Sequence, residues 1–109
     1  MVYYRRLCRV KVFVEKNYSS RIKQRTVARI ASLDPKYFST YFKMKTGVCF
    51  RDWLAWVRAE RAIAMMKANN YRISEIAFAV GYSDLRTFER AFKKVTGLTP
   101  KECKSKVRP

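Results

Sequence analysis

The sequence predicts an all-α fold of seven helices, and three observations support this prediction. Apolar residues make up 49% of the 109 residues, whereas there are only three glycines and three prolines, so we expect a packed core with short connections. Within residues 81–100, Phe88, Ala91, Phe92 and Val95 have the spacing of one buried helix face. A similar pattern of aromatic and basic residues occurs a second time, about fifty residues earlier in the chain.

Three helices are predicted in the first half of the chain. The first covers residues 4–16, and the second is shorter and covers residues 24–32. Their expected apolar faces are Tyr4, Leu7, Val10 and Val14 in the first helix and Val27, Ala28, Ile30 and Ala31 in the second. The third helix is expected to begin with Asp34 as its cap and Pro35 as its first helical residue, and to run to about Thr46.

Residues 50–68 form the longest predicted helix, which is about 28 Å long at 1.5 Å per residue. Its apolar residues cover more than one face, so we expect it to contact both halves of the chain. These residues are Phe50, Trp53, Leu54, Trp56, Val57, Ala62, Ile63, Met65 and Met66.

Three further helices are predicted after residue 68. A short helix covers residues 73–80, and its inward residues are expected to be Ile76, Ala77 and Val80. A turn at Gly81 and a cap at Ser83 then open the helix that Gly97 ends. The last helix is expected to begin with the capping box of residues 99–102 and with Pro100 at the first helical position. The basic tail, residues 104–109, is expected to fray.

The repeated pattern is specific enough to predict two structural units. The matched residues are Phe38, Phe42, Lys43, Thr46 and Gly47 in the first copy and Phe88, Phe92, Lys93, Thr96 and Gly97 in the second, at an offset of fifty. Upstream, Ala28 and Ala31 correspond to Ala77 and Val80 at an offset of forty-nine, so a turn is expected to differ in length by one residue.

A short helix, a turn and a longer basic helix, present twice, predict two helix-turn-helix units. We expect the first subdomain at residues 4–49, the bridging helix at residues 50–68 and the second subdomain at residues 69–109, all within one DNA-binding unit of residues 1–109.

The chain is strongly basic, with 25 lysine and arginine residues against 8 acidic residues and a formal net charge of +17. This excess favours a polyanionic partner, either nucleic acid or an anionic membrane. The apolar runs are far shorter than the ~18 residues of a membrane span. A membrane-active cationic protein would also need one continuous apolar face, which turns and caps interrupt here. We therefore expect double-stranded DNA, and no membrane, as the partner.

The second helix of a helix-turn-helix unit lies in the major groove of DNA, with its N-terminal residues at the base edges. The residues expected to face DNA are Lys36, Ser39, Thr40 and Lys43 in the first copy and Arg86, Thr87, Glu89, Arg90 and Lys93 in the second. Arginine can pair with guanine, glutamate can accept from cytosine, and threonine offers a hydroxyl or a methyl group. Lys43 and Lys93 lie deeper along their helices and are expected to contact phosphate.

Each of these residues also has a plainer interpretation as a solvated charge on a helix surface. For Glu89, an ion pair with Lys93 one turn later is an equal alternative. The aromatic residues Phe38, Tyr41 and Phe42, by contrast, have the spacing of a buried face and are expected in the core, as are Phe88 and Phe92.

Catalysis finds little chemical support, because the chain has no histidine and a general base would have to come from eight scattered acidic residues. The three cysteines, Cys8, Cys49 and Cys103, are widely spaced and show no C-x-x-C pattern. We expect no enzyme activity, no cofactor and no metal. Reduced thiols and the lack of a secretory signal pattern favour a cytoplasmic protein.

Several of these residues resemble the signature of the AraC/XylS family of transcription regulators, over about residues 7–104. The motifs are Val80-Gly81-Tyr82-Ser83-Asp84, Phe88-x-x-x-Phe92-Lys93-x-x-x-Gly97-x-Thr99-Pro100, Ile76-Ala77 and Arg58-x-x-x-Ala62. The resemblance implies a bacterial regulator with two helix-turn-helix subdomains joined by a long helix. It also implies that one molecule binds two adjacent major-groove segments and activates transcription through RNA polymerase. Arg58 would then pack near the second subdomain rather than read a base.

The sequence departs from the family pattern at a few positions. Lys23, Cys49 and Arg72 replace the usual capping residues, so the helices that follow them are expected to begin less firmly. Leu85 occupies a recognition-helix position where polar residues are common, so it either meets a thymine methyl group or packs.

The chain contains no visible small-molecule effector site, and two interpretations of its extent stay open. It is either a short regulator similar to the MarA/SoxS type or the DNA-binding half of a longer protein. The alternative function is a basic architectural DNA-binding protein without strong sequence preference, which would explain the charge but does not need two matched recognition helices.

Overall fold

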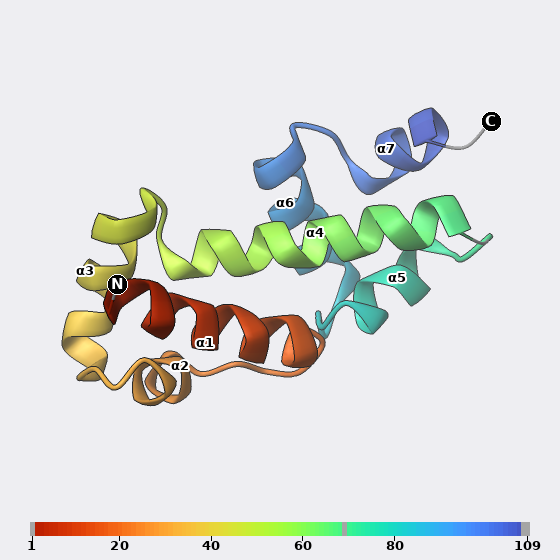
Figure 1. Cartoon of the computed structure of the whole chain (residues 1–109). Coiled ribbons are helices and arrows are strands. Elements are labelled where there is room, and N and C mark those ends of the chain that lie inside the picture. Colours follow the sequence, from red (N-terminus) through yellow and green to blue (C-terminus); the bar gives the residue numbers. More distant parts are fainter. Residues whose placement is uncertain (1, 69, 108–109) are drawn as a thin grey trace. The chain divides into compact units, whose positions relative to one another are not determined.

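A computed structural model of the protein describes residues 2–68 and 70–107, with side chains from residue 5 onward. Seven α-helices account for the regular structure of these residues (Figure 1). They are α1 (Val2–Asn17), α2 (Gln24–Ile30), α3 (Pro35–Thr46), α4 (Phe50–Ala68), α5 (Ile73–Ala79), α6 (Leu85–Thr96) and α7 (Pro100–Val107). The prediction of an all-α fold with seven helices is confirmed.

The predicted helix bounds agree closely with the structure, and the largest difference is at the C-terminus. Residues 104–107, which were expected to fray, are the second half of α7. Cys103 of this helix is buried, and the Lys104 ammonium donates a hydrogen bond to the carbonyl oxygen of Tyr71 at 2.6 Å. Residues 108–109 of the predicted tail lie outside the described residues.

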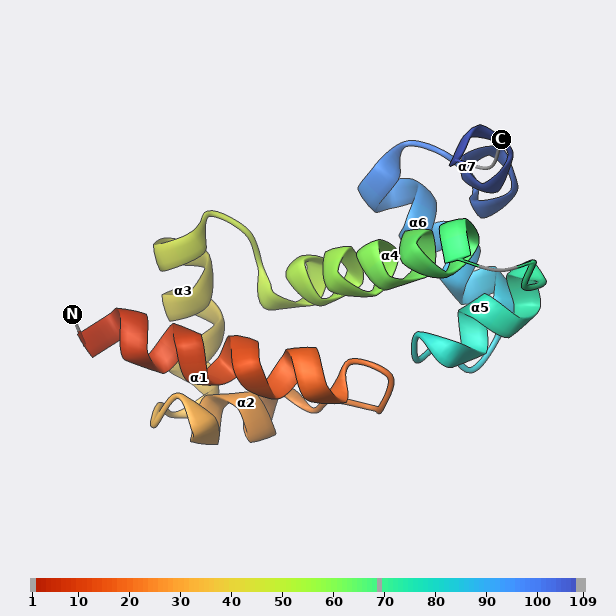
Figure 2. The ribbon, with the colours of Figure 1, turned by 45° about the vertical axis from the view of Figure 1, so that its right-hand side comes forward.

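The chain divides into two compact units, Met1–Leu54 and Ala55–Pro109, and the division falls within α4. Figure 2 shows α4 as one uninterrupted helix, so the first turn and a half of this helix belongs to the first unit and the rest to the second. None of the helices in the described part of the chain combines the length and the apolar character that a membrane crossing requires.

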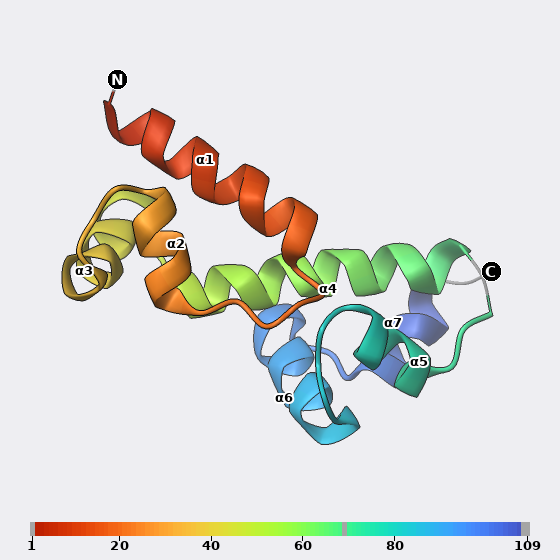
Figure 3. The same ribbon diagram turned by 90° about the horizontal axis from the view of Figure 1, so that it is seen from below.

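In the first unit, α1 packs against α2, and α2 packs against α3 (Figure 3). The buried residues Val10 and Val14 of α1, with Val27, Ala28 and Ala31 from α2 and its C-cap, agree with the predicted apolar faces. Leu7 and Ile30, which were predicted in the same faces, are only half-buried, and the predicted Tyr4 lies outside the described side chains.

Aromatic rings from α3 and α4 fill the rest of the first core. Phe50 meets Phe38 and Phe42 edge to face, with ring centroids 5.6 and 5.5 Å apart. Trp53 lies 5.7 Å from Phe42 and 6.0 Å from Phe50, measured between the same centroids. Such aromatic pairs add to the stabilisation from buried area alone. Because Phe50 and Trp53 belong to α4, the first turn of that helix is part of this core.

The second unit is built from the remainder of α4 with α5, α6 and α7, where α6 packs against both α5 and α7. Its core is formed by Ala62 and Met66 of α4, Ile76 and Ala77 of α5, Val80, and the two rings of α6, Phe88 and Phe92. The centroids of these two rings are 5.6 Å apart. Ala91 and Val95, which were predicted on the same face of α6, are half-buried.

One apolar residue of α4 does not follow the prediction. Trp56 was among the apolar residues through which this helix was expected to contact both halves of the chain, but 48% of its surface is exposed, whereas Ala59, which was not among them, is buried. The buried face of the helix in the second unit follows Ala59, Ala62 and Met66, at a spacing of three and four residues. Trp56, three residues before Ala59, lies at the edge of that face, and a mixed apolar pattern over nineteen residues does not reveal where the cover by neighbouring helices ends.

Candidate nucleic-acid interface

Each unit positions its longer helix by a turn with a left-handed residue. In the first unit Ser32 has φ 60°, and the N–H of Leu33 donates to the carbonyl of Ala28. In the second unit Gly81 has φ 112°, and the N–H of Tyr82 donates in the same way to Ala77. A positive φ costs little in glycine, whereas serine adopts it less readily. The two turns therefore have the same hydrogen-bond pattern with different residues.

The predicted length difference of one residue lies after this turn. The turn residues Ser32 and Gly81 are forty-nine positions apart, whereas the helix caps Asp34 and Asp84 are fifty apart. The extra residue is therefore Ser83. The prediction that Ser83 caps the second longer helix is wrong: Asp84 is the cap, because its carboxylate is the group that accepts a hydrogen bond from the first turn.

Both longer helices begin and end with strong local signals. The Asp34 carboxylate accepts from the N–H of Lys36 at 2.9 Å, and Pro35 is the first helical residue of α3. The Asp84 carboxylate accepts from the N–H of Thr87 at 2.7 Å. Left-handed glycines, Gly47 with φ 85° and Gly97 with φ 81°, end the two helices. These caps fix which residues are presented in the first turns of α3 and α6.

The shorter helices lack conventional side-chain caps, as the sequence indicated. The Lys23 side chain makes no capping hydrogen bond at the start of α2. At the start of α5, a guanidinium group cannot accept a hydrogen bond, so Arg72 caps nothing with its side chain, but its backbone N–H donates to the Glu75 carboxylate at 2.8 Å. The α5 start thus has half of a capping box, whereas α7 has the complete box that was predicted between Thr99 and Glu102.

The structure exposes nine of the ten residues that were predicted to face DNA. They are Lys36, Ser39, Thr40 and Lys43 on α3 and Arg86, Thr87, Glu89, Arg90 and Lys93 on α6. Leu85, the tenth, is half-buried at the first position of α6. On each helix the exposed residues lie opposite a pair of buried rings, Phe38 with Phe42 and Phe88 with Phe92. The core packing of each unit therefore turns this polar face outward.

Thr87 differs from the other exposed residues because its hydroxyl takes part in the helix cap. The hydroxyl donates to the Asp84 carboxylate at 2.8 Å, so Thr87 can offer DNA its methyl group and an acceptor oxygen but not this proton. The hydrogen bonds from the Thr87 N–H and hydroxyl lower the pKa of Asp84, and the charges of Arg90 and Arg86 lower it further. The same carboxylate thus holds the first turn of α6 and lies within the field of two candidate base-reading arginines.

The Asp84 cap gives a testable pH dependence. Replacing Asp84 with alanine should lower the melting temperature at pH 7 by about 2–8 °C, because the Thr87 N–H loses its acceptor. Since folding lowers this pKa, the stabilisation is present above the unfolded-state pKa of about 3.9 and is lost as the pH falls through the folded-state pKa. Thermal melts from pH 7 to pH 3 should therefore show the parent and the variant converging below about pH 4.

The control for this experiment is Asp84→Asn, which keeps an acceptor oxygen but cannot ionise. It should lose less stability than the alanine variant at pH 7, and its own cap should not weaken in acid. A difference between parent and alanine variant that stays constant down to pH 3 would contradict the role assigned to the carboxylate.

Arg58 has the packing role that the resemblance implied. Its guanidinium carbon lies 5.1 Å from the centroid of the Tyr82 ring, on the turn between α5 and α6. Burial raises the pKa of the Tyr82 hydroxyl, and the charge and hydrogen bond of Arg58 partly oppose this rise. The Tyr82 ring is in turn 5.5 Å from that of Phe88. Arg58 therefore connects α4 with the turn that positions α6.

The acidic residues and the cysteines of the described part of the chain are the groups that a metal site or a reactive thiol would need. In residues 2–68 and 70–107, no group of three or more histidine, cysteine, aspartate or glutamate side chains could hold a metal ion. The three cysteines are free thiols: Cys8 is exposed, Cys49 half-buried and Cys103 buried. Burial raises the pKa of the Cys103 thiol, which makes it a weaker nucleophile at neutral pH.

One exposed aromatic residue next to the predicted interface was not predicted as part of it. Tyr37, in the first turn of α3, lies between Lys36 and the buried Phe38, and 49% of its surface is exposed. The helical spacing contained a signal, because Tyr37 precedes Thr40 by three residues and so lies on the same side of the helix. Its aromatic character favoured a core position, and only the packing of α3 reveals that this residue is half exposed.

Two helix-turn-helix units, each with an exposed basic helix held by a buried aromatic pair, define a DNA-binding protein of the helix-turn-helix class. A family model described as a helix-turn-helix domain matches residues 27–106. A transcriptional regulator from Chromobacterium violaceum with an AraC-type DNA-binding domain has the same fold, with a TM-score of 0.84, 19% identity and coverage of 94% of this chain and 91% of that one. The chain belongs to the AraC family of helix-turn-helix DNA-binding regulators.

Relatives with higher identity are also regulators. The C-terminal domain of AraT, a response regulator from Geobacillus stearothermophilus, is 28% identical, with a TM-score of 0.84 over 93% of this chain and 84% of that one. The helix-turn-helix-type transcriptional regulator YijO of Escherichia coli K12 is 28% identical over 93 residues, which are 85% of this chain and 33% of that protein. The chain spans about a third of the length of the curated relatives it matches.

Proposed function

We propose that this chain is a sequence-specific transcription regulator that binds double-stranded DNA with α3 and α6 in two adjacent major-groove segments. One observation carries the proposal: α3 and α6 repeat the same arrangement, an exposed polar and basic face opposite a buried pair of phenylalanine rings. A recognition helix needs its apolar face fixed in a core and its polar face free for base edges and phosphates. The chain has this arrangement once in each unit.

The exposed residues divide by position along each helix. Those in the first two turns, Lys36, Ser39 and Thr40 on α3 and Arg86, Thr87, Glu89 and Arg90 on α6, are the candidate base readers. Arg86 and Arg90 suit guanine, and Glu89 suits the amino group of cytosine. Lys43 and Lys93 lie farther along and suit phosphate oxygens, which hold the protein in register without reading sequence. Leu85 suits an apolar contact at the edge of the second interface.

The regulatory role of the whole protein is the second part of the proposal. AraT and YijO are described as a response regulator and a transcriptional regulator, and this chain aligns with part of YijO. We therefore assign the chain the DNA-binding role in a regulator that acts in the bacterial cytoplasm. Activation through contact with RNA polymerase is the mode that we expect, since a protein bound beside a promoter can recruit the enzyme by a surface contact.

The proposal is tested by selecting bound sites from a pool of random duplex DNA. A sequence-specific regulator should enrich one asymmetric site with two unlike segments, because α3 and α6 carry different outward residues. The two segments should lie about 10 base pairs apart, which is one turn of the DNA helix. We call the base pairs read by α3 the first box and those read by α6 the second box. A pool that stays random after selection, with tight binding retained, would instead indicate an architectural DNA-binding protein.

A mutational test separates the two boxes. Arg86→Ala or Arg90→Ala should relax the preference in the second box only, by about 1–3 kcal/mol for an arginine that holds a guanine. Lys36→Ala should act only on the first box. Affinities are measured for each variant on the selected site, and on sites in which one box or the other is scrambled.

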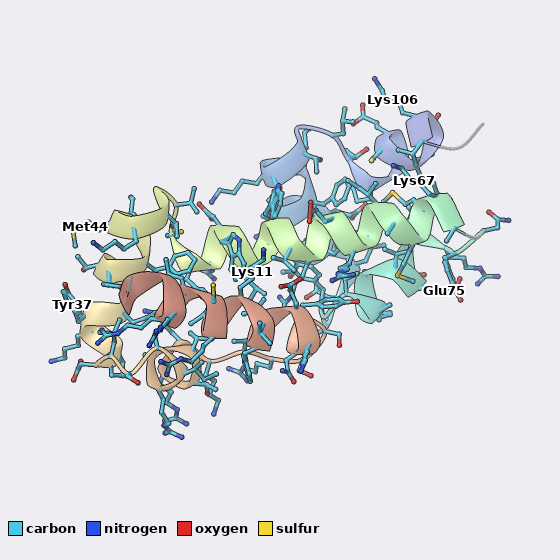
Figure 4. The ribbon with its side chains drawn as sticks, viewed as in Figure 1. Lys11, Tyr37, Met44, Lys67, Glu75 and Lys106 are labelled. Atoms are coloured by element: carbon cyan, nitrogen blue, oxygen red, sulfur yellow. The ribbon has the colours of Figure 1, made fainter. Side chains whose placement is uncertain are left out.

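Lys67→Gln serves as a control. Lys67 lies in the last turn of α4, a helix to which no base contact is assigned (Figure 4). Its replacement should therefore change neither preference. The tandem arrangement is wrong if Arg86→Ala and Lys36→Ala lose specificity at the same base pairs. It is equally wrong if the selected site is a palindrome that requires two molecules.

A further inference from the structure

An apolar border runs along one side of the recognition face of α3. Tyr37 and Met44 are 49% and 61% exposed, although both are large apolar side chains. With Thr40 they occupy positions i, i+3 and i+7, which place all three on one side of the helix. Figure 4 shows Tyr37 and Met44 along the same outer edge of α3. The polar face of α3 is therefore continuous with an apolar surface that its core does not cover.

The second copy provides an internal comparison. At the offset of fifty, Tyr37 corresponds to Thr87 and Met44 to Lys94, both exposed and polar. The apolar border is therefore a property of α3 alone and not a requirement of the repeated fold. A partner that contacts the apolar border should therefore bind the first unit and not the second.

Tyr37 has the better position for reading DNA. It is the third residue of α3, in the first turn, where a recognition helix brings side chains to base edges. Its ring packs against that of the buried residue Tyr41, with the two centroids 6.0 Å apart and the ring planes tilted by 49°. This contact restricts the Tyr37 side chain before it binds, so less side-chain freedom is lost on contact.

The chemistry of the major groove limits what such a ring can recognise. Among the four base pairs, the one apolar group displayed there is the C5 methyl group of thymine. An exposed aromatic ring beside a base-reading helix therefore suits this methyl group. We propose that Tyr37 is a specificity-determining residue that contacts the methyl group of a thymine in the first box.

This proposal rests on the proposed function, because it requires that α3 lies in the major groove. It assigns no base contact to Met44, which lies two turns, or about 10 Å, farther along the helix. Met44 therefore provides a matched control, because it is an exposed apolar residue of the same border at a different position along the helix. An alternative occupant of the border, an apolar surface of another protein, would involve both residues together.

The experiment uses uracil in place of thymine, a change that removes only the methyl group. The site selected by the parent chain is synthesised with each thymine of the first box replaced in turn by uracil, and dissociation constants are measured. We expect one replacement to weaken parent binding by about fourfold, the value of one buried methyl group. The Tyr37→Ser variant, which removes the ring and introduces no methyl group, should bind the thymine and uracil sites equally.

Two further variants make the assignment specific. Tyr37→Phe keeps the ring and should keep the fourfold dependence on the methyl group, whereas Met44→Ala should leave this dependence unchanged. Thermal melts of all variants confirm that they fold, which is expected because Tyr37 is half exposed.

The possible outcomes are distinguishable. The proposal is overturned if the first box contains no thymine, if uracil is tolerated throughout that box, or if Tyr37→Ser keeps the dependence. Loss of the dependence in Met44→Ala would overturn the assignment to Tyr37 alone. In each of these cases the parent still binds a selected site, so the proposed function stands. If the parent selects no site, the proposed function itself fails.

Discussion

Phe88→Ala should lower the free energy of unfolding by about 3–5 kcal/mol, the range found when a buried phenylalanine is truncated and leaves a cavity. Phe88 is 1% exposed, and its ring contacts those of Tyr82 and Phe92. A domain of this size is expected to have a total stability of about 5–15 kcal/mol. Denaturant titration monitored by circular dichroism should therefore show a large decrease in the midpoint, and the second unit should lose its recognition helix along with its core.

Phe78→Ala is the control for this prediction. Phe78 is a residue of the same type in the same unit, on α5, but 56% of its surface is exposed. Its replacement should cost much less, about 1 kcal/mol or below, because an exposed ring leaves no cavity. Equal costs for the two variants, or a Phe88→Ala protein that unfolds like the parent, would mean that the buried face of α6 has been assigned incorrectly.

The affinity for DNA should fall by about 10³-fold or more between 50 and 200 mM salt. This expectation follows from roughly 6–10 phosphate contacts, each of which releases counterions when a lysine or arginine binds. The net charge of +17 makes such a number of contacts available. Binding to the selected site is measured by fluorescence anisotropy at several salt concentrations, and the slope of log affinity against log salt gives the number of phosphates neutralised.

Single lysines can be tested through the same slope. Lys43→Gln and Lys93→Gln should each reduce the slope by about 1, and each should weaken binding to all sequences about equally, because a phosphate contact reads no base. Lys67→Gln, at the end of α4, should leave the slope unchanged. An affinity that is nearly independent of salt would rule out the backbone contacts assigned to α3 and α6.

Much of the second unit was predictable because its signals are local. The periodic spacing of Phe88 and Phe92, the left-handed Gly97 and the capping box of Thr99 and Glu102 each involve residues within a few positions of one another. The cap of α6 was nevertheless predicted incorrectly, as Ser83 instead of Asp84. Both are adjacent polar residues with capping ability, and the choice depends on where the turn after Gly81 places the backbone.

The outward faces of α3 and α6 were also predictable, since a helix that buries one face must expose the other. The details at the edge of these faces were not. Thr87 was predicted as a DNA-facing residue, but its hydroxyl proton is bound by Asp84. Tyr37 was not predicted there, although 49% of its surface is exposed. For Thr87 the deciding factor is a neighbouring side chain, the Asp84 carboxylate.

The sequence by itself therefore determined the seven helices, the duplication of the helix-turn-helix pattern and the basic character of both outward faces. Caps, turn glycines and helical periodicity act over distances of a few residues, so they can be recognised without knowing the fold. Only the tertiary structure decided that Trp56 is exposed while Ala59 is buried, that the last helix continues to Val107, and that Tyr37 borders the recognition face. Each of these depends on which groups from other parts of the fold surround a residue, such as the backbone carbonyl of Tyr71 that accepts a hydrogen bond from Lys104, and sequence spacing does not contain that information.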